Sequence, residues 1–293
     1  MNMPRRVAVI SKALGGSWIS TMNQLNGVQS VEVKLPENIV VVDDIGSRDP
    51  AIIRRGTFDD VEVSINGVFE PSRALNGLLR CLLNYSTTTN PDAGVRYRHV
   101  YGVYLPESSV RVCQIHVENE GSSISIDQAI VKSIKIGIEG TGIATYSVEA
   151  VGRYVTNTPS TINTDTIRPL YRLSGSSNVL KAEISINANH KPVYEINGVS
   201  KVIGIGRYEI EASIDHTNNG PFIASRDNTS ATLHLNILGD TLGSLNYGLE
   251  FSLGNAYAIS SLPVKAGNVV VFRSRYVGNL STFAVNNNIS TVE

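Results

Sequence analysis

Apolar and polar residues alternate along most of this chain, and this period constrains the fold more than any other feature. The longest run is Tyr208-Glu209-Ile210-Glu211-Ala212-Ser213-Ile214-Asp215. Shorter runs occupy residues 61–65, 134–139, 146–150, 184–188, 233–237 and 249–253. Because successive side chains of a strand point to opposite faces, each run predicts a strand with one buried and one wetter face. The pattern favours antiparallel sandwiches or barrels over a parallel sheet.

One segment, residues 72–85, departs from this period and predicts a helix. Its apolar residues recur at spacings of three and four: Ala74, Leu75, Leu78, Leu79, Leu82 and Leu83. Ser72 is a suitable N-cap, and Pro71 comes just before it. Gly77 costs about 1 kcal/mol relative to Ala in a helix interior, so we expect the helix to depend on packing against a sheet. The helix either closes one end of a sandwich or lies at a subunit boundary.

Two short sequence motifs occur once in each half of the chain. Ile65-Asn66-Gly67-Val68 reappears 131 residues later (196 − 65) as Ile196-Asn197-Gly198-Val199. Arg153-Tyr154-Val155 reappears 122 residues later (275 − 153) as Arg275-Tyr276-Val277, and we expect each copy to close its half. The repeated motifs indicate a duplicated β-domain, and changes in loop length between the copies would explain why the two spacings differ.

We therefore expect two tandem antiparallel β-sandwich or barrel domains, residues 1–155 and 170–293. Residues 156–169 between them are threonine-rich, polar and aperiodic, which is typical of a linker or an extended crossing strand. The Asn66-Gly67 and Asn197-Gly198 pairs predict tight turns. Residues 38–56 and 85–100 are polar and long for loops.

Composition excludes several functional classes. The chain has 293 residues and a net charge of −1, so binding to nucleic acid through its phosphates is not expected. No apolar run is long enough for a signal-peptide core or a membrane span, so we expect synthesis in the cytoplasm. The two cysteines, Cys81 in the helical segment and Cys113 in a strand-like run, are expected to be reduced packing residues.

No group of residues predicts catalysis, a cofactor or a metal site, and we expect the protein not to be an enzyme. The five histidines lack the spacing of metal ligands, and His116 and His234 fall in strand-like runs. Gly204-Ile205-Gly206 has no following helix of a dinucleotide site. The acidic pairs Asp43-Asp44 and Asp59-Asp60 are interpreted as solvated loop charges, because adjacent residues of a strand point to opposite faces and cannot act as an acid/base couple.

Three blocks of the sequence resemble the tail tube proteins of tailed bacteriophages, in their long form with two tube-type domains. They are the amphipathic helix at residues 72–85, the run at 101–110 (YGVYLPESSV) followed by a strand, and the run at 134–153 with Gly140-Thr141-Gly142 between two alternating strands. The second half is similar in type, with Leu262-Pro263-Val264 before a hairpin into residues 269–276. It departs from the first half in having no equally clear helix.

The resemblance implies a structural virion protein that stacks as rings around a channel for DNA, which passes without specific binding. A duplicated chain would form a trimeric, pseudo-hexameric ring, and a hexamer of chains is the alternative. Implied partners are other tail proteins: a sheath if the tail contracts, a tape measure, a terminator, and a tail tip or baseplate. Implied locations are the host cytoplasm during assembly and the virion tail. Alternatives are a tail hub, distal tail or baseplate protein, and a carbohydrate-binding β-sandwich adhesin.

Overall fold

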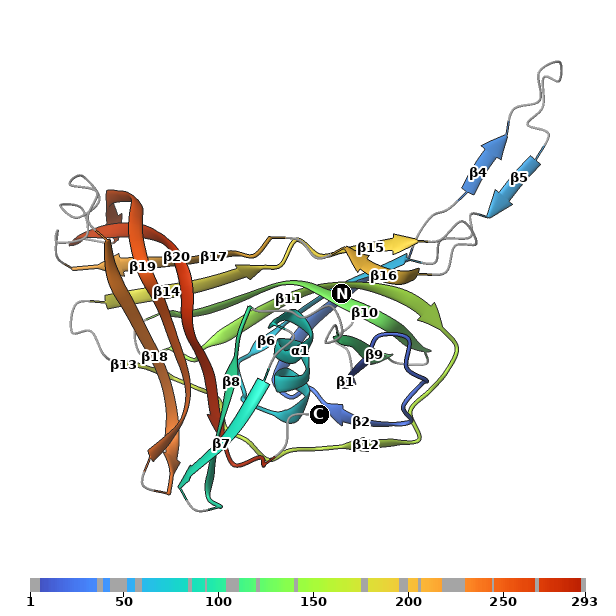
Figure 1. Cartoon of the computed structure of the whole chain (residues 1–293), viewed down its shortest axis with the longest axis horizontal. Helices are drawn as coiled ribbons and strands as arrows, with labels where there is room; N and C mark the ends of the chain where they lie inside the picture. Colours follow the sequence, from blue (N-terminus) through green and yellow to red (C-terminus); the bar gives the residue numbers. More distant parts are fainter. Residues whose placement is uncertain are drawn as a thin grey trace.

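A computed structural model gives the structure of the chain. It describes residues 6–35, 39–42, 52–55, 60–83, 86–92, 94–103, 111–119, 122–139, 142–174, 179–194, 200–204, 207–217, 230–243, 245–266 and 269–290. The described chain is mainly β with one helix and a large curled sheet, which confirms the predicted fold class (Figure 1).

The first half contains the helix α1 (Arg73–Leu83) and most of the short strands. Its strands are β1 (Arg6–Ala13), β2 (Thr21–Gln24), β3 (Val28–Lys34), β4 (Ile39–Val42), β5 (Ile52–Arg55), β6 (Asp60–Val68), β7 (Ser86–Asp92), β8 (Arg96–Tyr101), β9 (Arg111–Asn119), β10 (Ser122–Glu139), β11 (Thr145–Val155) and β12 (Thr161–Asn163).

The second half, as described, contains strands alone. They are β13 (Arg172–Ser174), β14 (Val179–Asn187), β15 (Lys191–Tyr194), β16 (Ser200–Gly204), β17 (Glu209–His216), β18 (Ser230–Leu242), β19 (Leu245–Ala266) and β20 (Val269–Asn287). Every run of alternating residues that predicted a strand lies in or overlaps one of these elements.

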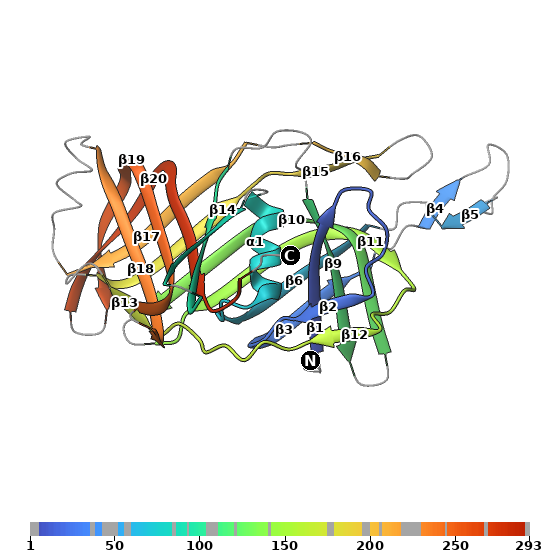
Figure 2. The same ribbon diagram turned by 60° about the horizontal axis from the view of Figure 1, so that its bottom comes forward.

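One sheet of 16 strands runs through both halves of the chain. The two halves meet where β10 pairs with β14, and again where β20 pairs with β8. The hairpins β4–β5 and β15–β16 are separate two-stranded sheets, and β4–β5 projects far from the body of the molecule (Figures 1 and 2). Since strands of both halves share one sheet, the division into domains at residues 1–155 and 170–293 stays a prediction.

Helix α1 lies against the inner face of the curled sheet, as its stripe of leucines predicts. Leu75, Leu78, Leu79 and Leu82 are buried in the main core. Ser72 accepts a hydrogen bond of 3.3 Å from the backbone N–H of Leu75 through its Oγ, which confirms it as the N-cap. The helix therefore packs inside the sheet of its own chain, and its burial supplies the stability that its sequence lacks.

The Asn66-Gly67 turn prediction is wrong, because both residues lie inside β6 and pair with Ser147 and Tyr146 of β11. The glycine is required for a different reason. A Cβ on Gly67 would lie 2.7 Å from the carbonyl oxygen of Gly27 and 3.0 Å from the ring of Tyr146. Asn197 and Gly198 lie outside the described residues.

The expected linker at residues 156–169 contains the short strand β12, which pairs in parallel with β2. The crossing-strand alternative therefore describes this segment better than a free linker. The long polar segments at 38–56 and 85–100 contain the hairpins β4–β5 and β7–β8 rather than loops alone. The second Arg-Tyr-Val does not close its half, because β20 continues past Val277 to Asn287.

Candidate assembly edges and a duplicated bulge

The two halves of the chain have the same strand order. In the first half, β3 pairs with β6, β6 with β11, β11 with β10 and β10 with β9. In the second half, β14 pairs with β17, β17 with β20, β20 with β19 and β19 with β18. The hairpins β4–β5 and β15–β16 occupy the same place in each series. The same arrangement of five strands therefore occurs twice. The first unit consists of β3, β6, β11, β10 and β9, and the second unit consists of β14, β17, β20, β19 and β18. Helix α1 with β7 and β8 is an insertion in the first unit.

The register irregularities of the sheet repeat as well. Pairing between β10 and β11 shifts between Asp127 and Ile130 and again between Val131 and Ser133. Pairing between β19 and β20 shifts between Gly254 and Tyr257 and between Ala258 and Ser260, and a further shift between Ser252 and Leu253 has no counterpart in β10. Each position of the two matching shifts in β19 lies 127 residues after its counterpart in β10 (for example, 254 − 127 = 127). Bulges at one constant offset are strong evidence for duplication, since each inserts a residue at a defined point.

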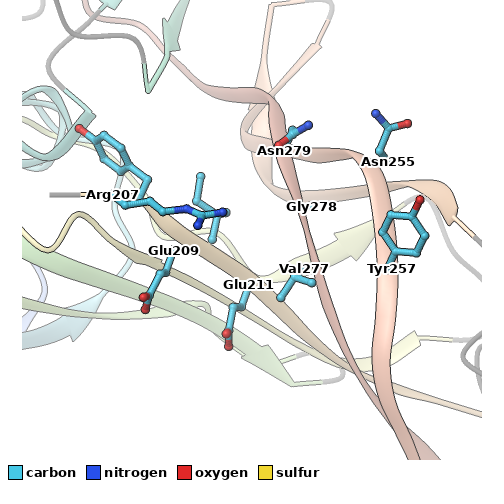
Figure 3. Close-up of a pocket in the computed structure, with 10 residues that line it drawn as sticks. Arg207, Glu209, Glu211, Asn255, Tyr257, Val277, Gly278 and Asn279 are labelled. Atoms are coloured by element: carbon cyan, nitrogen blue, oxygen red, sulfur yellow. The ribbon is translucent and has the colours of Figure 1, made fainter. Parts of the chain in front are cut away.

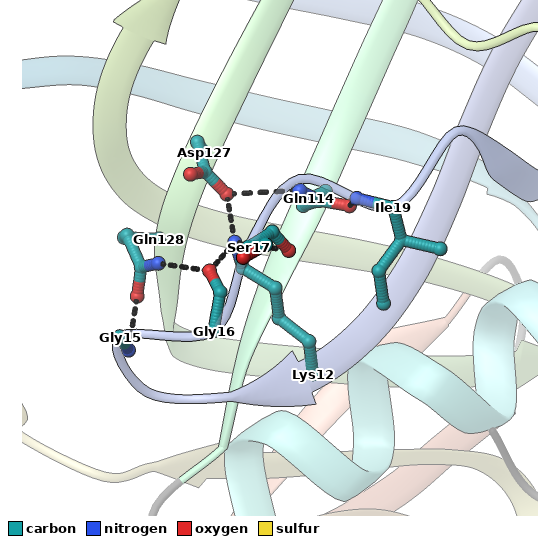
Figure 4. A network of polar contacts seen from close by, with 8 residues as sticks. All are labelled: Lys12, Gly15, Gly16, Ser17, Ile19, Gln114, Asp127 and Gln128. Atoms are coloured by element: carbon teal, nitrogen blue, oxygen red, sulfur yellow. Dashed lines mark hydrogen bonds and ion pairs between the residues drawn. The ribbon is translucent and has the colours of Figure 1, made fainter.

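The first bulge is closed by the loop between β1 and β2 (Figure 4). Gln128 has a φ of 52° and lies opposite Gly152, where a Cβ would approach the Cα of Ala129 to 2.7 Å. The Gln128 amide accepts a hydrogen bond from Gly15 N and donates one to Gly16 O, at 3.0 and 3.3 Å. The loop is thus fastened to the bulge at two backbone atoms.

An ion pair between the buried Lys12 and the half-buried Asp127 supports the same loop. Lys12 is 3% exposed and its Nζ lies 2.6 Å from Asp127 Oδ1 and 2.6 Å from Gly16 O. Gln114 donates to Asp127 at 3.1 Å and accepts from the backbone N–H of Ile19 at 3.0 Å (Figure 4). Each side chain of this network donates to an acceptor or accepts from a donor, and a buried polar network is stable when its groups are paired in this way.

The equivalent bulge in the second unit is open. Asn255 has a φ of 48° and lies opposite Gly278, as Gln128 lies opposite Gly152. No described loop covers it, and Asn255, Tyr257 and Asn279 line a pocket of about 580 Å³ with Arg207 and Glu211 (Figure 3). The pocket therefore marks the place that the β1–β2 loop fills in the first unit, and it has no counterpart of that loop among the described residues.

The joint between the two units is an antiparallel ladder of β10 with β14. It covers residues 133–139 of β10 and 181–187 of β14, and it pairs Lys135 with Ser185 and Gly137 with Glu183. Residues 133–139 of β10 lie beyond the part that pairs with β9 and form an edge of the first unit, and β14 is the edge strand of the second. The second unit therefore supplies hydrogen-bond partners to a strand edge of the first unit that would otherwise be exposed.

The counterparts of these two edges have no partner in the described chain. Residues 258–266 of β19 correspond to 131–139 of β10, and they pair with β20 on one side alone. Strand β3 corresponds to β14 (179 − 28 = 151), and it pairs with β6 alone among the described residues. Charged Glu32 and Lys34 on β3 and Pro263 on β19 are features that natural sheets use on exposed edges.

One face of the path β3-β6-β11-β10-β14-β17-β20-β19 is polar, and the other faces the core. Five of the cations on the polar face pair with carboxylates: Lys34 with Glu32, Lys132 with Glu62, Lys181 with Glu139, Arg273 with Asp215, and Arg275 with Glu211. Asp215 is 10% exposed on its side chain and accepts two hydrogen bonds of 2.8 Å from Arg273. The Arg273 guanidinium holds the pKa of the Asp215 carboxyl below its usual value.

Two histidines and both cysteines lie in the kinds of element that the sequence predicted for them. His116 is buried in β9 and contacts Ser125 Oγ at 2.7 Å, and His234 lies in β18. Cys81 and Cys113 are free and buried. Within the described ranges, no group of three or more His, Cys, Asp or Glu side chains could hold a metal ion. Asp43, Asp44 and Asp59 lie outside those ranges, and Asp60 begins β6.

Comparison with known proteins does not place the chain in a family. No family model matches it, and no curated protein matches it. No described helix is long and apolar enough to cross a membrane.

The duplication stays a prediction, and the sequence motifs that indicated it do not match the alignment of the strands. Arg153 corresponds in the sheet to Asn279 (153 + 126), not to Arg275, because β11 and β20 are offset by 126 residues. Ile65 corresponds to Ile214 (65 + 149) rather than to Ile196. A signal that could have given the right alignment is the pair Gln128-Ala129 and Asn255-Ala256 within long alternating strands.

Proposed function

We propose that this protein is a structural subunit that joins head to tail with copies of itself into closed rings, which stack into a hollow tube. The observation that supports this most directly is the β10–β14 joint, whose two edges recur, without a described partner, as β19 and β3. A surface that fits a different surface on the next copy forms rings when the rotation closes. Ring closure also removes exposed strand edges.

The internal joint specifies the register of the external one. Gly137 pairs with Glu183 inside the chain. Gly137 corresponds to Val264 (137 + 127), and Glu183 corresponds to Glu32 (183 − 151). Val264 of one copy is therefore proposed to lie opposite Glu32 of the next, in an antiparallel ladder. Pro263 lacks an N–H, so this ladder has at most one hydrogen bond fewer than its internal model.

Three copies are the number that we propose for a ring. Each chain contributes a path of eight strands, β3-β6-β11-β10-β14-β17-β20-β19, so three copies contribute 24 strands in six similar units. Barrels of about 16–18 strands already leave an aqueous channel, so a barrel of this size is open. The tail tube proteins that the sequence resembles form rings of six-fold or pseudo-six-fold symmetry.

The polar face of the path is proposed to line the channel. Its ion pairs leave few cations available to phosphate groups, and binding to nucleic acid depends on such cations. DNA would then pass along the wall without being held. The projecting β4–β5 hairpin and the β7–β8 hairpin are proposed contacts to the neighbouring ring (Figure 1).

A tail hub or distal tail protein is the second candidate, since the same two edges would also close a single ring that does not stack. The experiment is electron microscopy of the purified protein, with rotational classification of end-on views. Long hollow tubes with three-fold or pseudo-six-fold sections support a tube subunit, and isolated rings support the hub. Monomers at high concentration would contradict both.

A further inference from the structure

Two thiol groups meet in the core at the contact between α1 and β9. Cys81 lies two residues before the end of α1, and Cys113 lies in β9. Their Sγ atoms are 2.6 Å apart, and the two residues are 2% and 0% exposed. The chain contains two cysteines in all, so each thiol has the other as its sole possible partner within one molecule.

We propose that Cys81 and Cys113 are a site of reversible covalent cross-linking, at which oxidation ties α1 to β9. A disulfide bond has an S–S length of about 2.05 Å, and the two Sγ atoms are already 2.6 Å apart, so a small movement of the side chains would bring them to bonding distance. This inference is independent of the proposed tube, because it concerns one chain.

The oxidant that we propose is a small-molecule disulfide. A thiolate of the pair attacks it, forms a mixed disulfide and releases one small thiol. The second protein thiol then attacks the mixed disulfide, closes the Cys81–Cys113 bond and releases the second small thiol. The protein loses two electrons and two protons, and the small disulfide is reduced to two thiols.

Burial controls when this reaction takes place. Both thiols are out of reach of solvent, so an oxidant meets them when the end of α1 opens locally. The dithiol is expected in reducing cytoplasm, and the cross-link is expected after release from it. The bond would join residues 32 positions apart, which constrains the unfolded chain and stabilises the folded one.

The test incubates the full chain with oxidised glutathione, quenches in acid, denatures, and counts maleimide additions by mass spectrometry. We expect two additions before oxidation and none after it, in a product that migrates as a monomer without reductant. Urea at concentrations below the unfolding midpoint should accelerate the loss of thiols that react with maleimide. The midpoint itself should rise on oxidation and return with dithiothreitol.

Cys81→Ala and Cys113→Ala are the matched controls, and each should keep a midpoint that oxidised glutathione does not raise. The proposal is overturned if both thiols survive prolonged oxidation in urea just below the midpoint. It is also overturned if the bond forms between chains, if glutathione stays attached, or if the single variants show the same rise in midpoint.

Discussion

Gln128 and Asn255 occupy the same position in two β-bulges, 127 residues apart, and each adopts a left-handed conformation (φ 52° and 48°) opposite a glycine. Left-handed residues other than glycine are uncommon. Two of them at the same bulge position, with Gly152 and Gly278 across the ladder, are explained by duplication of one unit. The relationship also fixes the alignment from which the external joint follows.

Gly152→Ala should destabilise the protein, because the new Cβ would lie 2.7 Å from Ala129 Cα and 2.7 Å from Ile126 Cγ2. Overpacking of this kind costs about 1–3 kcal/mol. Gly254→Ala is the control, since its Cβ would meet Ser281 at an ordinary 3.7 Å. Urea unfolding measures both variants. Equal midpoints for the two would show that the close approach at Gly152 does not constrain the sheet.

Lys12→Met should destabilise the chain more than an exposed charge deletion does. The substitution leaves Asp127 and the Gly16 carbonyl without the cation that binds both. Breaking a buried ion pair costs about 3–5 kcal/mol, and an exposed pair about 0–1 kcal/mol. Lys181→Met, at the exposed pair with Glu139, is the matched control. Similar losses of unfolding free energy for both variants would contradict a special role for Lys12.

Removing Arg273 should make the free energy of unfolding less sensitive to acid pH. The folded-state pKa of Asp215 is lowered by Arg273, with smaller contributions from Lys181 and His216. A carboxyl with a lowered folded pKa contributes stability above its unfolded pKa, about 3.9, and this stability is lost as the pH falls through the folded pKa.

Wild type should therefore lose more unfolding free energy than Arg273→Met as the pH falls from about 5 through the lowered folded pKa of Asp215. Arg6→Met, at an exposed pair with Glu118 of 3.9 Å, is the control for loss of an arginine. Urea titrations across this range measure the difference. Parallel curves for wild type and Arg273→Met would rule out the linkage.

Pro263→Val should increase association between copies. Pro263 lies on an edge strand and lacks the N–H of a ladder hydrogen bond, and proline on an edge limits uncontrolled pairing. Light scattering of freshly purified protein should show larger species for Pro263→Val than for wild type at equal concentration. Leu180→Val, an exposed site on β14, serves as the control. A fall in association would mean that the proline promotes the joint.

The sequence predicted those parts of the fold that depend on local periodicity. Residues 208–215 alternate cleanly, and β17 (Glu209–His216) has the expected buried face at Ile210, Ala212 and Ile214. Ser72 and the leucine stripe predicted α1 because caps and helical spacing are local signals. These features need no knowledge of distant partners.

The remaining features depend on contacts between distant residues. Gly67 resembles a turn residue in sequence, yet it is a glycine because the backbone of Gly27 approaches it. The pairing of β10 with β14 could not be predicted from either sequence, because a strand with alternating residues has the same pattern at an edge and in the centre of a sheet. The two free edges were therefore visible only once the pairing of every described strand was known.

Cysteine cross-linking between copies tests the proposed joint most directly. In a chain with Cys81→Ala and Cys113→Ala, Glu32→Cys and Val264→Cys would place thiols opposite each other across the joint. Oxidation of the assembled protein should give covalent species up to a closed ring, separated on gels without reductant. Glu32→Cys with Leu262→Cys, two residues out of register, should cross-link weakly. Equal cross-linking by the two pairs, or none by the first, would contradict the joint.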